Sequence, residues 1–298
     1  MVPVCAALFI AISYPIGALA VSVVSPFLLI TLRFTVIAAV LWGWLLLQHL
    51  TRPQRTLLPR GVQWGWSIAA GILVQGVQIL AAYWAIAHGV GPGMCALVIA
   101  MNPVATAVLA RVLRGTRENR WGYLALALGA LGVVIACLPT VMADPRLGPG
   151  LIAVLIALTG LAVGSFLQGQ HLAHVTPLAF TAVGSAASVP LALVLALIAP
   201  EHVTHPREAI VLLGVLVVTS ALGVGLYAAC VRRSGARHAS VMFAVIPALA
   251  AVGSWAMLGT GIEPSTLIGL AFGAVACLAQ VRSARVAAAR VPVVTPRP

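Results

Sequence analysis

Charge is scarce in this sequence, and lysine is missing altogether. Of its 298 residues, 62% are hydrophobic and 7% are charged, and only five are acidic. Such a composition leaves too little polar surface for a soluble globule, which makes a bilayer the expected solvent. The net charge of +12 would also suit nucleic acid, but short arginine clusters with almost no aromatic neighbours are typical of membrane loops. We therefore expect a lipid bilayer, and no nucleic acid, as a partner.

Cysteine pairs, metal-ligand clusters and hydrolase motifs are also absent from the sequence. The five cysteines lie one to an apolar segment without a C-x-x-C pair, which favours buried thiols over a zinc site or a disulfide framework. The pairs His171/His174 and His202/His205 have no cysteine or shared carboxylate cluster beside them, which favours interfacial histidines over metal ligands. No H-E-x-x-H, G-x-S-x-G or P-loop is present, and neither a metal nor a cofactor is expected.

Ten apolar stretches are long enough to cross a bilayer, which needs about 20 residues per helix. Charges and Gly/Pro clusters place them at residues 3–24, 26–48, 63–87, 91–113, 121–139, 149–171, 177–199, 208–231, 238–258 and 263–281. The first stretch ends in small residues like a signal peptide, but no cation precedes Arg33, and Pro15 and Gly17 interrupt the run. It therefore predicts a first transmembrane helix.

Apart from Arg33, the arginines lie almost entirely in every second gap between these stretches, with only Arg146 and Arg207 in the other gaps. Their clusters are Arg52, Arg55 and Arg60; Arg111, Arg114, Arg117 and Arg120; Arg232, Arg233 and Arg237; and Arg282, Arg285, Arg290 and Arg297. The other gaps hold four of the five acids, which are Asp144, Glu201, Glu208 and Glu263. Because cytoplasmic loops are enriched in arginine, the pattern predicts a multi-pass protein of the bacterial inner (plasma) membrane with both termini cytoplasmic.

The sequence repeats itself at an offset of 144 residues. Tyr83, Gly91, Pro103, Gly115 and Gly129 recur as Tyr227, Gly235, Pro247, Gly259 and Gly273. Matching loops carry opposite charge bias, and five spans per copy is an odd number, so the second copy enters the membrane inverted, as in secondary transporters. We expect an all-α integral membrane protein of ten transmembrane helices in two inverted five-helix repeats. The repeats are placed at residues 1–140 and 149–281, and a basic cytoplasmic tail at 282–298 that can touch anionic lipid.

Several local motifs accompany the repeat. They are the Leu32-Arg33-Phe34 triplet in the second span, the run from Tyr83 to Asn102-Pro103-Val104, the short link at Glu118, and the second copy of this unit ending at Pro247. With these features the chain resembles the EamA-like ten-helix exporters of the drug/metabolite transporter superfamily over nearly its whole length. The resemblance implies two EamA-like repeats and a transport function, and it leaves the substrate open.

Polar residues near the middle of the spans are the candidates for substrate binding, because inverted-repeat transporters bind substrate near the midplane. The candidates are Arg33, Gln75, Gln78, Asn102, Tyr14, Tyr83, Tyr227 and Thr219. Such side chains can instead form hydrogen bonds between helices, each of which stabilises the fold by about 0.6 kcal/mol on average. For Gln75, Gln78 and Asn102, substrate binding and helix packing are equally favoured. Threonine and serine can bond to carbonyls of their own helix, which favours a packing role for them.

Arg33 is the only formal charge inside a predicted span that lies more than a few residues from the end of that span. A cation at that depth costs a few kcal/mol unless it faces a cavity, water or a partner. It either meets an anionic group of the substrate, or it snorkels to the outer headgroups or caps the end of a neighbouring helix. Pro103 and Pro247 lie at matching places in the fourth and ninth spans, where proline kinks a helix; such kinks suit hinges of alternating access, although static packing would also explain them.

Together these features favour a secondary transporter for small metabolites, namely amino acids or similar solutes moved by efflux across the plasma membrane. Alternating access around a midplane polar cavity would carry them. No acidic residue lies near the centre of a span, which favours facilitated diffusion or exchange over proton coupling. The alternatives are a membrane-embedded enzyme and a non-transporting receptor or scaffold. The expected partners are a small-molecule substrate and the bilayer, for a monomer or a homodimer, and no enzyme activity is expected.

Overall fold

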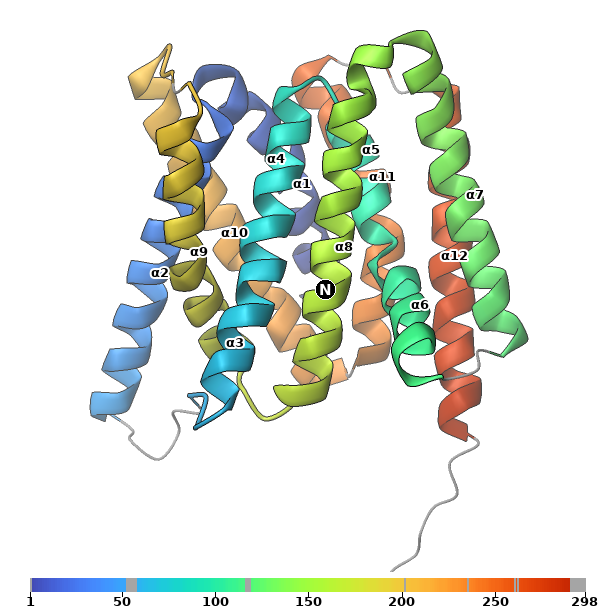
Figure 1. The fold of residues 1–298 in the computed structure, drawn as a ribbon, viewed down its shortest axis with the longest axis horizontal. Helices are drawn as coiled ribbons and strands as arrows, with labels where there is room; N and C mark the ends of the chain where they lie inside the picture. The colour runs from blue at the N-terminus through green and yellow to red at the C-terminus, as the bar shows by residue number, and fades with distance from the viewer. Residues whose placement is uncertain are drawn as a thin grey trace, which may run out of the picture.

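A computed structural model describes residues 2–51, 58–115, 119–200, 202–234, 236–259, 261 and 263–289. Within these ranges the side chains of residues 2–3, 140, 141, 143, 224, 227–234, 236–244, 284, 285 and 287–289 are not described. All regular elements in the described ranges are helices (Figure 1), and one isolated antiparallel bridge joins Val24 to Val203.

The first half contains five spans, two of which are composite. They are α1 (Val2–Val23), α2 (Pro26–Thr51), the continuous series α3 (Gln63–Gly71), η2 (Ile72–Val77) and α4 (Gln78–Ala87), the pair α5 (Pro92–Ala100) and α6 (Asn102–Arg114), and α7 (Arg120–Ala143). The segment η2 is a π-helix inside the third span. Gly115 ends α6 with a φ of 63°, a left-handed conformation that glycine adopts without a steric penalty.

The second half follows a short 3-10 turn, η3 (Pro145–Leu147). Its helices are α8 (Gly148–His171), α9 (Pro177–Ile198), α10 (Pro206–Ser234), α11 (Ala236–Leu258) and α12 (Pro264–Ala289). Proline is the first residue of α9, α10 and α12, where its missing N–H costs no helical hydrogen bond. In the described residues nine helices are long and apolar enough to cross a membrane, and the described side chains of α11 add a shorter apolar segment. The predicted all-α membrane fold is confirmed.

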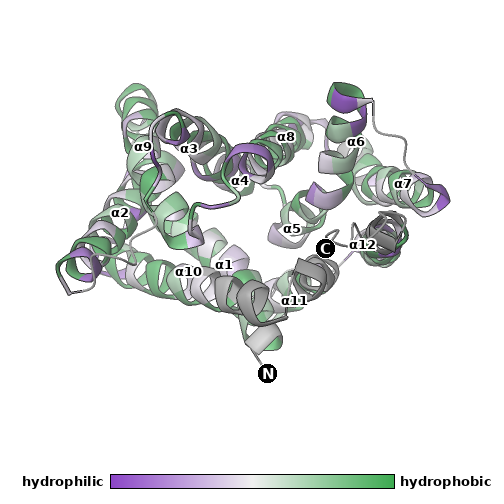
Figure 2. Ribbon diagram, turned by 90° about the horizontal axis from the view of Figure 1, so that it is seen from below, coloured by the Kyte–Doolittle hydropathy of each residue, from purple (hydrophilic) through white to green (hydrophobic). Residues whose placement is uncertain are grey.

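The main contacts between helices are symmetric: when each helix is replaced by its counterpart in the other half, these contacts are found again. The corresponding helices α2 and α9, α5 and α11, and α7 and α12 lie in contact across the bundle. The contact of α1 with α10 is matched by that of α8 with α4, and the contact of α1 with α11 by that of α8 with α5 and α6. Figure 2 shows these pairs from one end of the bundle. The repeat bounds 1–140 and 149–281 themselves remain a prediction.

Most of the described arginines outside the spans lie at one end of the bundle and the described acids at the other, which Arg146 and Arg207 share. The end of α6 and the start of α7, which carry Arg111, Arg114 and Arg120, lie at the lower end in Figure 1. The connection from α7 to α8, with Asp144, and the start of α12 beside Glu263 lie at the upper end. This arrangement follows the charge alternation of the sequence, and we refer below to the arginine end and the acid end.

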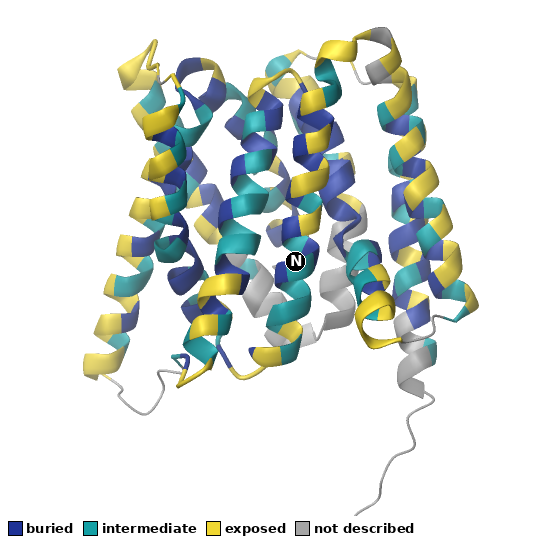
Figure 3. Cartoon of the chain, viewed as in Figure 1, coloured by how far each residue is buried: buried dark blue, intermediate teal, exposed yellow. Residues whose placement is uncertain are grey.

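Small residues let the helices approach closely inside the bundle, while large apolar side chains face outward (Figure 3). A Cβ atom added to Gly71 of α3 would lie 2.4 Å from the Cα of Gly184 in α9, and one added to Gly132 of α7 would lie 3.1 Å from the carbonyl oxygen of Gly269 in α12. Glycine at such crossings is typical of helix packing in lipid, where no hydrophobic driving force draws helices together.

Candidate functional site

Arg33 of α2 is buried, with 8% of its surface exposed. Its Nη1 donates a hydrogen bond of 3.1 Å to the hydroxyl of Tyr83 in α4, and its Nη2 donates one of 2.8 Å to the Oγ of Ser220 in α10. The Nε is also buried and has no hydrogen-bond partner among the described residues. The guanidinium group therefore points into the bundle, where its partners are neutral hydroxyls and the N–H of the buried Nε has no acceptor among the described residues.

Two tyrosines surround this arginine. The ring of Tyr83 lies 5.6 Å from the guanidinium carbon, within the range of a cation–π interaction. It reaches this place because Gly17 of α1 has no side chain, since a Cβ there would lie 2.7 Å from the ring. Tyr14, also of α1, lies close enough to Tyr83 and Arg33 to interact with them electrostatically. We call Arg33, Tyr83, Tyr14 and Ser220 the Arg33 cluster.

Ser220 is the functional neighbour that sequence reasoning missed in favour of Thr219. The Thr219 hydroxyl donates to the carbonyl oxygens of Val215 and Leu216 at 2.8 and 3.2 Å, within its own helix. Ser220, about 100° further round the helix, accepts the bond from Arg33. The Thr219 hydroxyl is thus satisfied within its own helix, as its residue type favoured.

This pair of neighbours gives a matched test of the cluster. Ser220→Ala removes an acceptor from a buried cation, and we expect it to lower the free energy of unfolding by about 1.5–3 kcal/mol, the usual contribution of a hydrogen bond to a charged group. Thr219→Ala removes a buried methyl group and a hydroxyl that bonds only within its own helix, and should lower it by about 1 kcal/mol or less. Thermal unfolding of both variants in detergent measures the difference, and equal midpoints would contradict the assignment of Ser220 to Arg33.

Gln75 and Gln78 lie elsewhere, at the π-helical segment of the third span. A Cβ added to Gly184 of α9 would lie 3.2 Å from the Cγ of Gln75, so Gln75 packs against α9. Both glutamines are partly exposed, and no described residue provides them with a hydrogen-bond partner. Gln75 lies inside the π-helix and Gln78 directly follows it; such unpaired amides fit a polar lining, since π-helical segments often lie at functional sites.

The Gln75 contact joins the pair of helices that corresponds to the pair joined by Arg33, although the contacting residues differ by one position, because the repeat mate of Ser220 is Gly76. At the repeat offset of 144, Thr219 corresponds to Gln75; at the offset of 151 that relates Pro26 to Pro177, Arg33 corresponds to Gly184. In one half the long polar side chain comes from α2 and reaches α10, and in the other it comes from η2 and reaches α9. The two halves thus offer a cation at one place and a neutral amide at the related place.

Asn102 lies at a break in the fourth span. Helix α5 ends at Ala100 and α6 begins at Asn102, with Met101 at φ −72° and ψ 2°. The Nδ2 of Asn102 donates to the Oγ of Ser165 in α8 at 3.5 Å, and its Oδ1 accepts from Thr106 at 3.3 Å. The break places a buried amide between α6 and α8.

The matching proline of the second half does not interrupt its helix. Pro247 lies inside α11, which runs from Ala236 to Leu258, whereas Pro103 belongs to the first turn of α6. The residue before each proline explains the difference in part. Asn102 provides side-chain hydrogen bonds at a position where proline disfavours helix, while its mate Ile246 is a buried apolar residue that packs in the interior. Tyr227, the mate of Tyr83, lies where side chains are not described.

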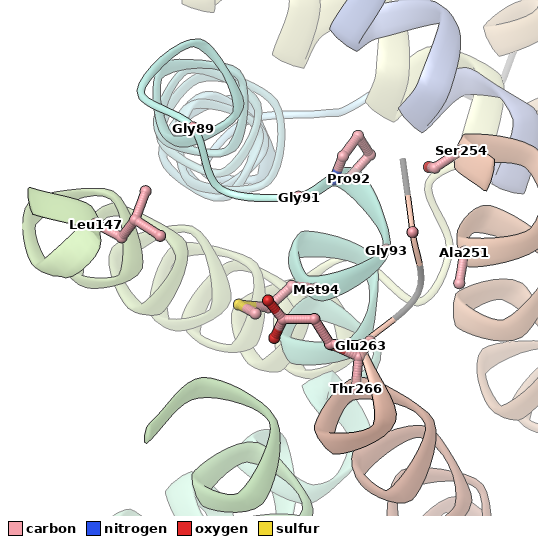
Figure 4. A pocket seen from close by; sticks show the side chains of 11 residues that line it. Gly89, Gly91, Pro92, Gly93, Met94, Leu147, Ala251, Ser254, Glu263 and Thr266 are labelled. Carbon is pink, nitrogen blue, oxygen red and sulfur yellow. The ribbon is translucent and has the colours of Figure 1, made fainter. Parts of the chain in front are cut away.

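A pocket of about 220 Å³ opens at the acid end between α5, α11 and α12 (Figure 4). Its lining includes Gly93 and Met94 of α5, Ala251 of α11, and Glu263 and Thr266 at the start of α12. A Cβ on Gly93 would lie 3.1 Å from the Cα of Ala251, so the pocket lies where the two halves touch. The Arg33 cluster does not contribute to its lining.

Metal ligands do not gather in the part of the chain that the structure describes, where no three of His, Cys, Asp and Glu come together. His171 instead stacks on Trp66 with ring centroids 4.1 Å apart, and His88 stacks on Trp84 at 3.7 Å. Aromatic and histidine rings near helix ends are typical of membrane interfaces.

Comparison with known proteins gives one family and a shared fold. A family model described as the EamA-like transporter family matches residues 1–138 and 148–281. No curated protein matches the sequence. Twelve chains of known structure match it. One of them, described as "Crystal structure of protein", covers 96% of this chain with 97% of its own length, a TM-score of 0.65 and 17% identity. At that identity the likeness shows the fold alone.

Proposed function

Since this chain belongs to the EamA-like transporter family, we propose that it is a secondary transporter that exports small metabolites, amino acids or similar solutes, by alternating access. The Arg33 cluster carries this proposal. It combines a buried cation, an unused Nε donor and hydroxyl groups, and its helices come from both halves of the chain. A polar site between inverted repeats is the place where such transporters hold their substrate.

The charge of Arg33 indicates what the substrate brings to the site. A cation taken out of water costs several kcal/mol unless an anion or hydrogen bonds compensate it. The described acidic residues Asp144, Glu208 and Glu263 lie at helix ends or links, away from the cluster. A carboxylate or phosphate of the substrate would supply the missing negative charge and accept from the Nε, while Tyr83 and Tyr14 would contact the rest of the solute.

The remaining candidates are proposed as parts of the path and of the moving elements. Gln75, Gln78 and Asn102 would provide neutral hydrogen-bonding groups beyond the Arg33 cluster, together with Tyr227. Pro103, at the break between α5 and α6, would be a hinge, and Pro247 would be its counterpart within α11. Thr219, which bonds to its own helix, would have no direct part in binding.

Coupling and orientation follow from the charges. Because the described acidic residues lie in links or in the first turn of a helix, and none of them lies near the middle of a span, we propose facilitated diffusion or exchange without a coupled proton. The arginine end would face the cytoplasm, which places both termini inside a bacterial inner membrane. The monomer is taken as the working unit, and a homodimer is compatible with this scheme. No catalytic group is assigned, so an enzyme activity is not part of the proposal.

Flux into proteoliposomes tests this function. Small carboxylates, including amino acids, should enter saturably, and the matched primary amide of the same solute should be transported about 10-fold or more less efficiently, because a hydrogen bond to a charged group contributes about 1.5–3 kcal/mol. A pH gradient across the membrane should change the rate little. Chemical turnover of a solute without vectorial movement would favour an enzyme instead, and strong dependence on the pH gradient would contradict uncoupled transport.

A further inference from the structure

A second pocket lies at the arginine end, between α7 and α12 and apart from the Arg33 cluster. It has a volume of about 300 Å³, and its lining is Trp121, Leu124, Val275, Leu278, Ala279, Val281 and Arg282. Arg282 is the one charged residue in this lining. We call it the α7–α12 pocket. Its walls suit a hydrocarbon chain, and its charge suits an anion at the mouth.

Two arginines are held around one indole at this pocket. The guanidinium carbon of Arg282 lies 5.0 Å from the ring centroid of Trp121, and that of Arg120 lies 5.6 Å from it. Cation–π contacts of this length restrict long side chains that would otherwise sample many conformations. Both arginines are exposed, so their remaining N–H groups are open to a ligand.

The frame of the pocket is fixed by one asparagine. The Oδ1 of Asn119 accepts from the backbone N–H groups of Trp121 and Gly122 at 3.0 and 3.1 Å, and its Nδ2 donates to the carbonyl oxygen of Ser283 at 3.0 Å. The start of α7 is thereby joined to α12 next to Arg282. The pocket therefore exists before any ligand binds, which lowers the entropic cost of binding.

The position of the pocket in the bundle identifies the kind of ligand. The side chains of Leu124, Val275 and Leu278 are about half exposed, and in a membrane-spanning helix such exposed apolar side chains contact acyl chains. A free inorganic anion would use the arginines but gain nothing from this apolar lining. A second copy of the chain would have to supply an acid here, and Glu118 is the only acid that the sequence places at the arginine end.

We propose that the α7–α12 pocket binds an anionic phospholipid. One acyl chain lies along Trp121, Leu124 and Leu278, and the phosphate receives hydrogen bonds from Arg120 and Arg282. Pockets between transmembrane helices that carry basic residues at the cytoplasmic side commonly hold anionic headgroups. The site is independent of substrate binding, because it shares no residue with the Arg33 cluster.

Native mass spectrometry of the detergent-solubilised full chain tests the charge requirement. Phosphatidylglycerol should be retained more strongly than phosphatidylcholine with the same acyl chains. The double variant Arg120→Gln/Arg282→Gln should weaken phosphatidylglycerol binding by about fivefold for each arginine and leave phosphatidylcholine unchanged. Arg146→Gln, in η3 at the other end, is the control and should bind as the wild type does. Equal retention of the two lipids by the wild type would overturn the proposal, whatever the variants do.

A second pair of variants tests the apolar wall. Val275→Phe fills the pocket and should lower phosphatidylglycerol retention, whereas Val134→Phe, on an exposed position of α7 outside the lining, should not. Competition by inorganic phosphate alone with the same potency as the lipid would show that the acyl chain plays no part, and would overturn the assignment. A dimer that replaces lipid binding and is lost in Val275→Phe would assign the pocket to a second copy instead.

Discussion

Arg33→Gln is expected to lower the affinity for an anionic substrate by about 10- to 100-fold, because it removes the only charge of the Arg33 cluster while keeping much of the side chain's length. The estimate corresponds to about 1.5–3 kcal/mol for hydrogen bonds between charged groups. The measurement is the KM of flux in proteoliposomes, supported by the substrate-induced shift of the unfolding midpoint. The affinity for a neutral amide of the same solute should change little, since that solute gains nothing from the charge.

Two further variants separate binding from structure. Arg33→Lys keeps the charge on a compact group and should retain part of the affinity, while Arg146→Gln at the acid end should behave as the wild type. If Arg33 serves only to join α2, α4 and α10, Arg33→Gln will lower the unfolding midpoint and leave KM unchanged. We expect Arg33→Gln to raise KM and to leave the unfolding midpoint nearly unchanged. Removing a buried charge altogether costs less stability than leaving the charge with fewer hydrogen-bond partners, as Ser220→Ala does.

The overall architecture could be predicted because it depends on quantities that a sequence carries directly. Span number follows from the length of apolar stretches, and the separation of charge between the two ends follows from arginines such as Arg60 and Arg111 against acids such as Asp144. Helix ends were predicted to within a few residues where proline or glycine marks them, as at Pro177 and Gly115. These signals act locally, so packing does not have to be known.

Local departures from a regular helix could not be predicted in the same way. The π-helix Ile72–Val77 has no compositional signature, and its hydrogen-bond shift depends on how Gly71 and Gly76 meet α9. The prolines Pro103 and Pro247 gave identical predictions, yet one lies at a helix break and the other within a helix. That difference comes from neighbouring side chains and tertiary contacts, which a repeat alone does not show.

For the candidate site, the sequence predicts which polar residues lie within the membrane-spanning segments, but not all of the contacts between them. Arg33 stood out by the cost of a buried charge, and Tyr83 by its place in the repeat, and the structure brings these two together. Ser220 was not separated from Thr219, because α10 is apolar on nearly every side and offers no face pattern to fix its rotation. Gly17 could not be recognised as part of the site from the sequence, because it has no side chain and leaves room for the Tyr83 ring.

A substitution at the close contact between the third span and α9 is expected to have the second large effect on stability and transport. Gly71 of α3 meets Gly184 of α9, and a Cβ on Gly71 would lie 2.4 Å from the Cα of Gly184. Backbone atoms cannot rotate away as a side chain can, so α3 or α9 would have to shift as a whole. Because Gly184 is the repeat mate of Arg33, this contact corresponds to the place where α2 meets α10 in the first half.

Gly71→Ala is therefore expected to lower the free energy of unfolding by about 1–3 kcal/mol and to abolish most flux, since the α3–α9 contact no longer closes. Gly65→Ala is the matched control in the same helix, because nothing lies within 4 Å of its added Cβ. It should be neutral or stabilise by up to about 1 kcal/mol through helix propensity. Thermal unfolding in detergent and flux in proteoliposomes measure both variants. Wild-type flux in Gly71→Ala would show that transport does not require this close approach.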